Sequence, residues 1–155
     1  MSTYENLPPF LLGFPGPLRD QLVAAVLGGA KTTTTGLLDE YEAEGEPLPR
    51  PGDRALLVDS AGLGVAVVEV TGVRVLRLAD VDLRHALDEG EGYTSVAEWR
   101  AVHEEFWHSE PVRAAVGDPE YHVTDDTVVV AERFRVVERV GPAHGSTAGT
   151  ADGRG

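Results

Sequence analysis

The sequence contains no cysteine, and this absence excludes disulfide bonds, thiolate catalysis and zinc sites built on cysteine. No apolar run approaches the roughly 20 residues that a membrane-spanning helix needs. The first ten residues, MSTYENLPPF, lack the basic segment with which a signal peptide begins. We therefore expect a cytoplasmic protein without a membrane partner.

Basic side chains are also scarce, because 13 lysines and arginines stand against 26 aspartates and glutamates, for a net charge of −13. Proteins that bind long nucleic acids need a basic surface that displaces counterions from the phosphates. The charge therefore argues against duplex DNA as a partner. It leaves open a small ligand in a pocket, or a few nucleotides at a local basic patch.

Lysine is the scarcest basic residue, since Lys31 is the only one beside 12 arginines and lies in the stretch GGAKTTTTG, residues 28–36. Abundant alanine, glycine, valine and arginine are typical of a GC-rich genome, in which arginine replaces lysine wherever it serves equally well. Lysine differs in its compact amine, which can lose its proton on burial. Lys31 is therefore either a residue that arginine cannot replace or a chance survivor on a solvated loop.

Apolar residues make up 42% of the 155 residues, which is enough for one domain with a core. We expect this domain to span residues 1–140. Residues 1–16 are rich in proline and glycine and are expected to form an irregular arm. Residues 141–155, GPAHGSTAGTADGRG, have low complexity and are expected to be a disordered tail.

Apolar periodicity predicts the order of the helices and strands. The expected helices lie within residues 17–29, 36–46, 78–92, 94–110 and 110–125, and the expected strands within 53–60, 65–78 and 126–140. Gly72 is a candidate β-bulge, and Thr94 or Ser95 is the expected cap of the fourth helix. This order favours a single-domain α+β fold, in which a small mixed or closed sheet has helices at its edges.

The GGAKTTTTG stretch is the first candidate site. Gly29 allows the backbone to approach a ligand closely. Lys31 and the neighbouring hydroxyls could bind an anion, or could supply a base and a nucleophile. These hydroxyls belong to Thr32, Thr33, Thr34 and Thr35. The alternative is a β-prone threonine strand with a solvated lysine.

The loop DEGEGYT, residues 88–94, is the second candidate site. Its glycines allow the chain to bend the carboxylate of Glu89 or Glu91 into a pocket. The alternative is an ordinary acidic surface loop.

The helix segment EWRAVHEEFW, residues 98–107, is the third candidate. Trp99, His103 and Phe106 share one face of this helix, and Arg100 lies near the edge of that face, where it could reach a ligand. The alternative is core packing with a hydrogen-bonded histidine. The five histidines have no ligand spacing, and no Walker loop, dinucleotide fingerprint or HExxH motif is present, so we expect neither a metal nor a cofactor.

Together these stretches resemble the ASCH domains, the activating-signal-cointegrator homology family. The resemblance covers about residues 10–140 and centres on G-x-K-x-x-T, which is Gly29, Lys31 and Thr34. It extends to the Gly52-Asp53 turn, the strand VEVTGVRV, the segment ALDEGEGYTSVAEWRAVHEEFW and the last strand VVVAERFRVV. It implies a PUA-like mixed β-barrel flanked by helices, with the G-x-K-x-x-T loop lining a cleft between barrel and helices.

The resemblance also implies RNA or modified nucleosides as partners. Small bacterial relatives hydrolyse the amide of N(4)-acetylcytidine with a lysine, a threonine and a glutamate, which correspond by motif to Lys31, Thr34 and Glu91. This chain is longer than those relatives, and its helix at residues 94–110 differs in form from theirs.

Two functions follow as hypotheses. In the first, the protein hydrolyses an amide of a small modified nucleoside, such as N(4)-acetylcytidine. Lys31 would be the general base, Thr34 the activated hydroxyl or the group that orients a water, and Glu91 the proton relay to the leaving amine. Gly29 and the loop amides would stabilise the oxyanion. The ligand-binding residues would be Gly29, Thr32, Thr33, Glu89, Tyr93, Trp99, Arg100 and His103.

In the second, the domain binds RNA or a nucleotide without catalysis. Lys31 would then contact phosphate, and Trp99 or Tyr93 would stack on a base. A third hypothesis is cleavage of single-stranded RNA, in which the same lysine would act as the base. The partner in each case is a small nucleoside or short single-stranded RNA, and the sequence leaves the oligomeric state open, a homodimer included.

Overall fold

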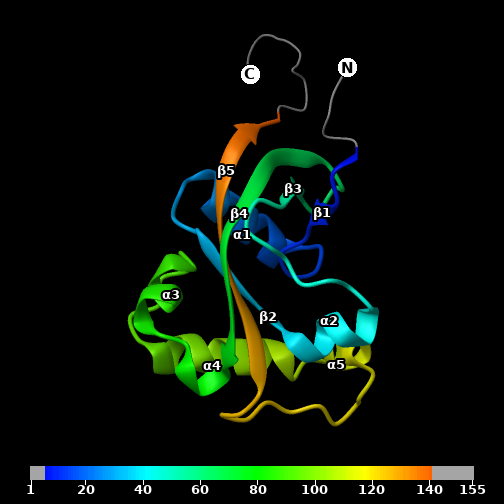
Figure 1. Cartoon of the computed structure of the whole chain (residues 1–155), viewed down its shortest axis with the longest axis vertical. Coiled ribbons are helices and arrows are strands. Elements are labelled where there is room, and N and C mark those ends of the chain that lie inside the picture. The colour runs from blue at the N-terminus through cyan, green and yellow to red at the C-terminus, as the bar shows by residue number, and fades with distance from the viewer. Residues whose placement is uncertain (1–5, 141–155) are drawn as a thin grey trace.

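Two long strands, β4 (Gly64–Arg77) and β5 (Val128–Arg139), form the antiparallel centre of the molecule (Figure 1). The structure is a computed structural model that describes residues 6–140. Strands β3 (Arg54–Val58) and β1 (Pro9–Phe10) extend one side, and β2 (Thr33–Leu37) pairs with the free edge of β5. The sheet order is β1-β3-β4-β5-β2, with β1 parallel to β3 and the other pairs antiparallel. The sheet curls into a half-barrel, which confirms the α+β, PUA-like expectation.

Helices pack against this half-barrel (Figure 1): α3 contacts β2 and α4, and α2 lies beside α5. The elements are α1 (Pro17–Leu27), α2 (Leu38–Glu44), the 3₁₀ turn η2 (Leu78–Asp80), α3 (Leu83–Asp88), α4 (Val96–Trp107) and α5 (Glu110–Val116). Ser95 caps α4 by accepting a hydrogen bond from the Glu98 amide at 3.1 Å. All five helical segments expected from the sequence are present. Within the described chain, none of the helices has the length and apolar character needed to cross a membrane.

Three strand features differ from the sequence expectation or refine it. Pro9–Phe10 lies in the segment expected to be irregular, but it pairs with β3 and forms β1. The threonine run forms β2, because its β-branched residues pair with β5. The pairing of β4 with β5 shifts register between Val70 and Gly72, which confirms the expected bulge. Residues 1–5 and the expected tail at 141–155 lie outside the described residues.

Alternation along β2 and β5 divides the core into two clusters, one on each face of the sheet. Leu37 and Val129 pack with Trp99 in the cluster beneath α3, α4 and α5. Phe134 packs with Val23 in the cluster beneath α1. This alternation also separates the threonines of β2, since Thr33 and Thr35 share the face of Leu37 while Thr34 faces the other way.

Candidate active site

The single lysine is a buried cation. Lys31 lies four residues beyond Leu27, the last residue of α1, and is only 2% exposed. Its Nζ lies 3.2 Å from Glu89 Oε1 and 3.3 Å from Glu91 Oε2, and it donates to the carbonyl oxygen of Thr33 at 2.9 Å. The structure therefore rules out a solvated lysine, and it joins two of the stretches singled out in the sequence, GGAKTTTTG and DEGEGYT.

The backbone amides around Lys31 already have acceptors. The Gly29 amide donates to the carbonyl of Val26 at 3.1 Å, and the Lys31 amide donates to that of Ala25 at 3.1 Å. The Thr32 amide donates to the carbonyl of Asp88 at 2.8 Å. An oxyanion could accept hydrogen bonds from these amides only if the existing bonds broke. The Lys31 ammonium, which lies beside the carboxylates, is therefore the better candidate donor to an oxyanion.

Gly90 explains how the acidic loop comes so close to Lys31. Its φ is +71°, a conformation that side chains disfavour. A Cβ at Gly90 would lie 2.4 Å from the carbonyl carbon and oxygen of Ala30 and 2.6 Å from the Lys31 amide nitrogen. The glycine spacing of DEGEGYT thus allows backbone to pack against backbone, and this packing carries Glu89 and Glu91 to either side of the lysine.

Glu89 is the central carboxylate of the cluster and is 1% exposed. Oε1 contacts Lys31 Nζ at 3.2 Å and lies 3.5 Å from His103 Nε2, while Oε2 accepts a hydrogen bond from Thr35 Oγ1 at 2.6 Å. Burial by itself would raise the pKa of Glu89. The Lys31 ammonium and the hydrogen bonds of His103 and His85 outweigh burial and hold that pKa well below its usual range.

His85 and Thr35 complete the hydrogen bonds of Glu89; the sequence offers Thr35 only as one of four candidate hydroxyls and does not single out His85. Thr35 Oγ1 lies 2.7 Å from His85 Nε2. Because the threonine proton goes to Glu89, His85 Nε2 must be the donor to Thr35. The chain of donors therefore runs from His85 to Thr35 to Glu89. The period-two alternation of β2 could have placed Thr35 beside Thr33, but the 50-residue separation from His85 gave no signal.

The α4 candidates lie around the same carboxylate. His103 Nδ1 donates to the carbonyl oxygen of Trp99 at 2.9 Å, and the two rings stack at 4.3 Å. Trp99 is fully buried and Tyr93 is 9% exposed, so a base could stack on either ring only if this region opened. The indole Nε1 of Trp99 is buried without a hydrogen-bond partner among the described residues. Phe106 packs at the edge of the core against Phe14.

Glu91 is the accessible end of the cluster, with a side chain that is 22% exposed. Its Oε1 accepts a hydrogen bond from Tyr93 Oη at 3.2 Å. Burial raises the pKa of Glu91, Lys31 opposes this shift, and the neighbouring Glu89 carboxylate adds to it. The net shift is upward, opposite to that of Glu89, so Glu91 takes up a proton more readily than an ordinary glutamate.

Thr34 points to the opposite face of the sheet from Thr33 and Thr35. Its cross-strand partner on β5 is Glu132, which is 6% exposed and which the sequence analysis did not single out. Burial and the charge of Asp53 raise the pKa of Glu132 to about 7. Glu132 has no ion pair or side-chain hydrogen bond with any residue between 6 and 140. The structure thus brings Lys31 and Glu91 together, and it places Thr34 beside a different carboxyl.

The remaining predicted site residues have structural contacts. Thr33 Oγ1 donates to the carbonyl oxygen of His85 at 2.9 Å. Thr32 Oγ1 donates to the carbonyl oxygen of Asp88 at 3.4 Å. Arg100 forms ion pairs with Glu104 and Asp125 at 2.7 Å and 2.6 Å. None of these three side chains contacts Lys31 Nζ; Thr32 and Thr33 fasten the start of β2 to α3, and Arg100 pairs with residues outside the cluster.

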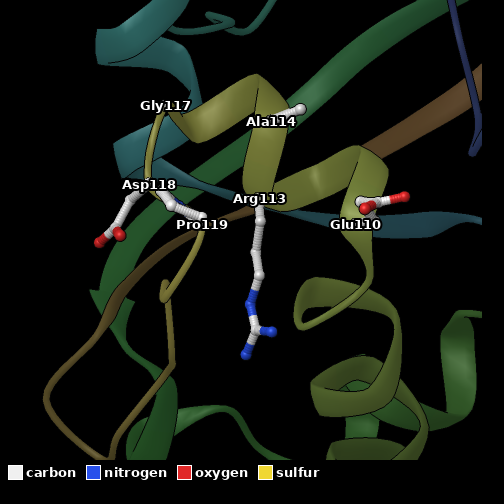
Figure 2. Close-up of a pocket in the computed structure, with 6 residues that line it drawn as sticks. All are labelled: Glu110, Arg113, Ala114, Gly117, Asp118 and Pro119. Atoms are coloured by element: carbon white, nitrogen blue, oxygen red, sulfur yellow. The ribbon is translucent and has the colours of Figure 1, made fainter.

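Two surface hollows accompany this cluster. Figure 2 shows one of about 300 Å³, lined by residues of α5 and of the turn that follows it. Arg113 belongs to this hollow, and its Nε donates to the carbonyl oxygen of Tyr121 at 2.8 Å. None of the lining residues contacts Lys31 or its glutamates. The second hollow, of about 380 Å³, lies between the β4–β5 ladder and the start of α3 and includes His85.

Comparisons with known proteins agree with this architecture. A crystal structure of an ASCH domain from Lactobacillus crispatus JV V101 matches with a TM-score of 0.73 and 24% identity, over 87% of this chain and 82% of that one. A protein from Enterococcus faecalis V583 matches with a TM-score of 0.73 and 24% identity, over 85% of this chain and 77% of that one. At this identity the two structures establish the fold alone. No curated protein sequence matches the chain.

The family model described as the ASCH domain matches residues 12–138, which include every residue of the Lys31 cluster. The chain belongs to the ASCH domain family, which is associated with RNA binding.

Proposed function

We propose that the Lys31 cluster is the active site of an amidohydrolase that acts on a small acylated nucleoside such as N(4)-acetylcytidine. The observation that carries this proposal is a buried ammonium between two carboxylates of different character. Glu89 is sealed from solvent and ionised, while Glu91 is partly exposed and has a raised pKa. Titratable groups whose environments push their pKa values apart are the arrangement used for acid–base catalysis.

The geometry favours Glu91 as the group that moves the proton. Glu91 accepts one proton from a water molecule, and the resulting hydroxide adds to the carbonyl carbon of the amide. As Glu91 takes up this proton, the Lys31 ammonium transfers the hydrogen bond that it gave to Glu91 to the developing oxyanion. The carbon–nitrogen bond then breaks, and Glu91 returns its proton to the leaving amine, so that the products are cytidine and acetate.

Glu89 has a positioning role in this scheme. Its Oε1 lies 3.2 Å from Lys31 Nζ, which it holds in place, and 3.5 Å from His103 Nε2. Thr34 is not needed, because its side chain lies on the other face of β2. The alternative scheme, with Lys31 as base and Thr34 as nucleophile, requires the Thr34 hydroxyl to reach the lysine around its own strand.

The test is hydrolysis of N(4)-acetylcytidine by the purified chain and two variants. Glu91→Gln should lower kcat/KM by at least about 100-fold, because acid–base catalysis contributes typically 10²–10⁴-fold. Thr34→Val should leave kcat/KM within a few-fold of the original. A loss of activity in Thr34→Val with Glu91→Gln still active would favour the Lys31 and Thr34 scheme, and no release of cytidine by the unaltered chain would reject the substrate.

RNA or nucleotide binding without catalysis is the second candidate function, and family membership supports it. Lys31 is a poor phosphate contact in this reading, because two carboxylates already surround its ammonium. Binding of a short single-stranded oligoribonucleotide, with an affinity that falls steeply with salt, would support it. Cleavage of that oligonucleotide would instead identify a single-strand ribonuclease. In each case we expect the protein to act in the cytoplasm.

A further inference from the structure

We infer that the hollow between the β4–β5 ladder and α3 is a phosphate-binding pocket, which shares only His85 with the Lys31 cluster. Three arginines line it, Arg74 from β4, Arg84 from α3 and Arg133 from β5, together with Asp82 and His85. Three of the twelve arginines of a chain with a net charge of −13 therefore converge on one hollow of about 380 Å³. The inference does not rest on the proposed hydrolysis, because the arginines that carry it take no part in the Lys31 cluster and because it is tested by binding.

Two of these arginines are held in place and keep unused donors. Arg74 Nη1 lies 3.3 Å from Asp82 Oδ2, and Arg133 Nη2 lies 2.9 Å from Asp88 Oδ2. Each ion pair links the sheet to one end of α3, so the two guanidinium groups flank the pocket. A guanidinium has five N–H donors, and each of these ion pairs uses only part of that capacity.

Arg84 is the free cation of the pocket. It is exposed, and it forms no ion pair or hydrogen bond with the part of the chain that the structure describes. Asp82, in the lining, and Asp88, beside it, offset two of the three arginine charges and leave one positive charge in excess. Glu132 also borders the hollow, but its side chain projects from the other face of the sheet with Thr34, so it contributes backbone here.

The arrangement matches the chemistry of a phosphate group. A phosphate offers several oxygen acceptors in different directions, and guanidinium groups bind such oxygens through paired N–H donors. The volume of about 380 Å³ is near the lower end of ligand pockets, which span roughly 300–1,000 Å³. It has room for one phosphate and an attached sugar, so the ligand class is a nucleoside monophosphate or a single phosphate of a flexible strand.

The first experiment is a titration of the ¹⁵N-labelled chain with inorganic phosphate at constant ionic strength. Amide signals of residues 72–74, 82–85 and 131–133 should shift together. Arg84→Gln should weaken binding about tenfold, as expected for the loss of one charge-assisted hydrogen bond. Arg84 is exposed, so this variant should fold normally.

Arg135→Gln is the matched control. Arg135 lies on β5 two residues beyond Arg133 and pairs with Glu69 outside the pocket. Its substitution by glutamine removes the same charge as Arg84→Gln. Its substitution should leave phosphate affinity within about twofold of the original, since binding at a defined site depends on local donors more than on net charge. Equal weakening by Arg84→Gln and Arg135→Gln, or no shifts at these residues, would overturn the inference.

A second set of ligands identifies the source of the phosphate. Cytidine 5′-monophosphate should bind while cytidine does not, and equal binding of the two would overturn the inference. Binding of the dinucleoside monophosphate CpC would assign the pocket to the RNA backbone, whereas binding confined to the terminal monophosphate would assign it to a free nucleotide. Phosphate binding and amide hydrolysis are independent readouts, so the failure of one proposal is distinguishable from the failure of the other.

Discussion

Glu89 and Glu132 are two buried glutamates on opposite faces of one sheet, and they are only 1% and 6% exposed. Glu89 has Lys31, Thr35 and two histidines around its oxygens, and its pKa is lowered. Glu132 has no such partners among the described residues, and its pKa is raised to about 7. The partners, more than the burial, therefore decide which carboxyl keeps its charge.

The comparison gives each face of the sheet a different electrostatic character. On the α3 and α4 face, a cation compensates the buried carboxylate, and an ionised cluster persists at neutral pH. On the α1 face, the carboxyl can avoid the cost of burying its charge only by binding a proton. The proposed site needs the first arrangement, because Lys31 and Glu89 must stay ionised where bulk water is excluded while Glu91 takes up and returns a proton.

The largest expected effect is the loss of the lysine. Lys31→Met should destabilise the protein by about 3–5 kcal/mol, because it leaves Glu89 buried without its cation. Chemical denaturation at pH 7 measures this change. The double variant Lys31→Met, Glu89→Gln should recover much of the loss, and additive effects of the two substitutions would contradict the pairing.

The second largest loss of stability should come from a substitution that blocks the close approach of the acidic loop to Lys31. Gly90→Ala should cost more than about 2 kcal/mol, because the added Cβ meets backbone atoms at 2.4 Å and the positive φ is itself strained. Gly92→Ala is the matched control, since Gly92 also has a positive φ, of +89°, but a Cβ there meets nothing within 4 Å. It should cost only about 1 kcal/mol, and thermal denaturation of both variants would separate contact from strain.

Substitution of Glu132, the buried carboxyl on the other face of the sheet, should stabilise the protein instead of destabilising it. A carboxyl with a raised pKa in the folded state destabilises the protein increasingly as pH rises from its ordinary pKa toward the folded value of about 7. Glu132→Gln should therefore stabilise the protein by on the order of 1–3 kcal/mol at pH 8 and much less at pH 4.5. A variant that is equally destabilised at both pH values would contradict a buried, uncompensated charge.

The smallest effect distinguishes adjacent threonines on the two faces. Thr35→Val should cost about 1–2 kcal/mol, because it removes a hydrogen bond to the buried Glu89 carboxylate and leaves the His85 donor without its acceptor. Thr34→Val should change the free energy of unfolding by less than about 0.5 kcal/mol, since Thr34 does not contact the cluster. Equal losses would mean that the two faces are not separated as the strand register indicates.

The sequence predicted the part of the site that depends on local pattern. The isolated Lys31 and the glycine-spaced Glu89 and Glu91 stood out by residue type, and the structure joins them. The helices were also predictable, because their apolar spacing and caps are local signals.

The parts of the fold and of the site that the sequence did not predict depend on pairing between distant segments. His85 and Thr35 meet only because β2 pairs with β5 beside α3, and no local pattern specifies that contact. Pro9–Phe10 becomes a strand only because β3 offers an edge. Alternation separates Thr34 from Thr35, but it does not tell which face receives the lysine, so the sequence alone cannot choose between these two hydroxyls.

The most direct measurement is a carboxyl titration by carbon-detected NMR, which follows the side chains of Glu89, Glu91 and Glu132 from about pH 4 to pH 9. The account predicts that Glu132 titrates near 7, that Glu91 titrates above the ordinary glutamate pKa, and that Glu89 stays ionised throughout. If all three carboxyls titrated together near the ordinary value, or if Glu89 took up a proton before Glu132, the contrast between the two faces and the ionised Lys31 cluster would both be contradicted.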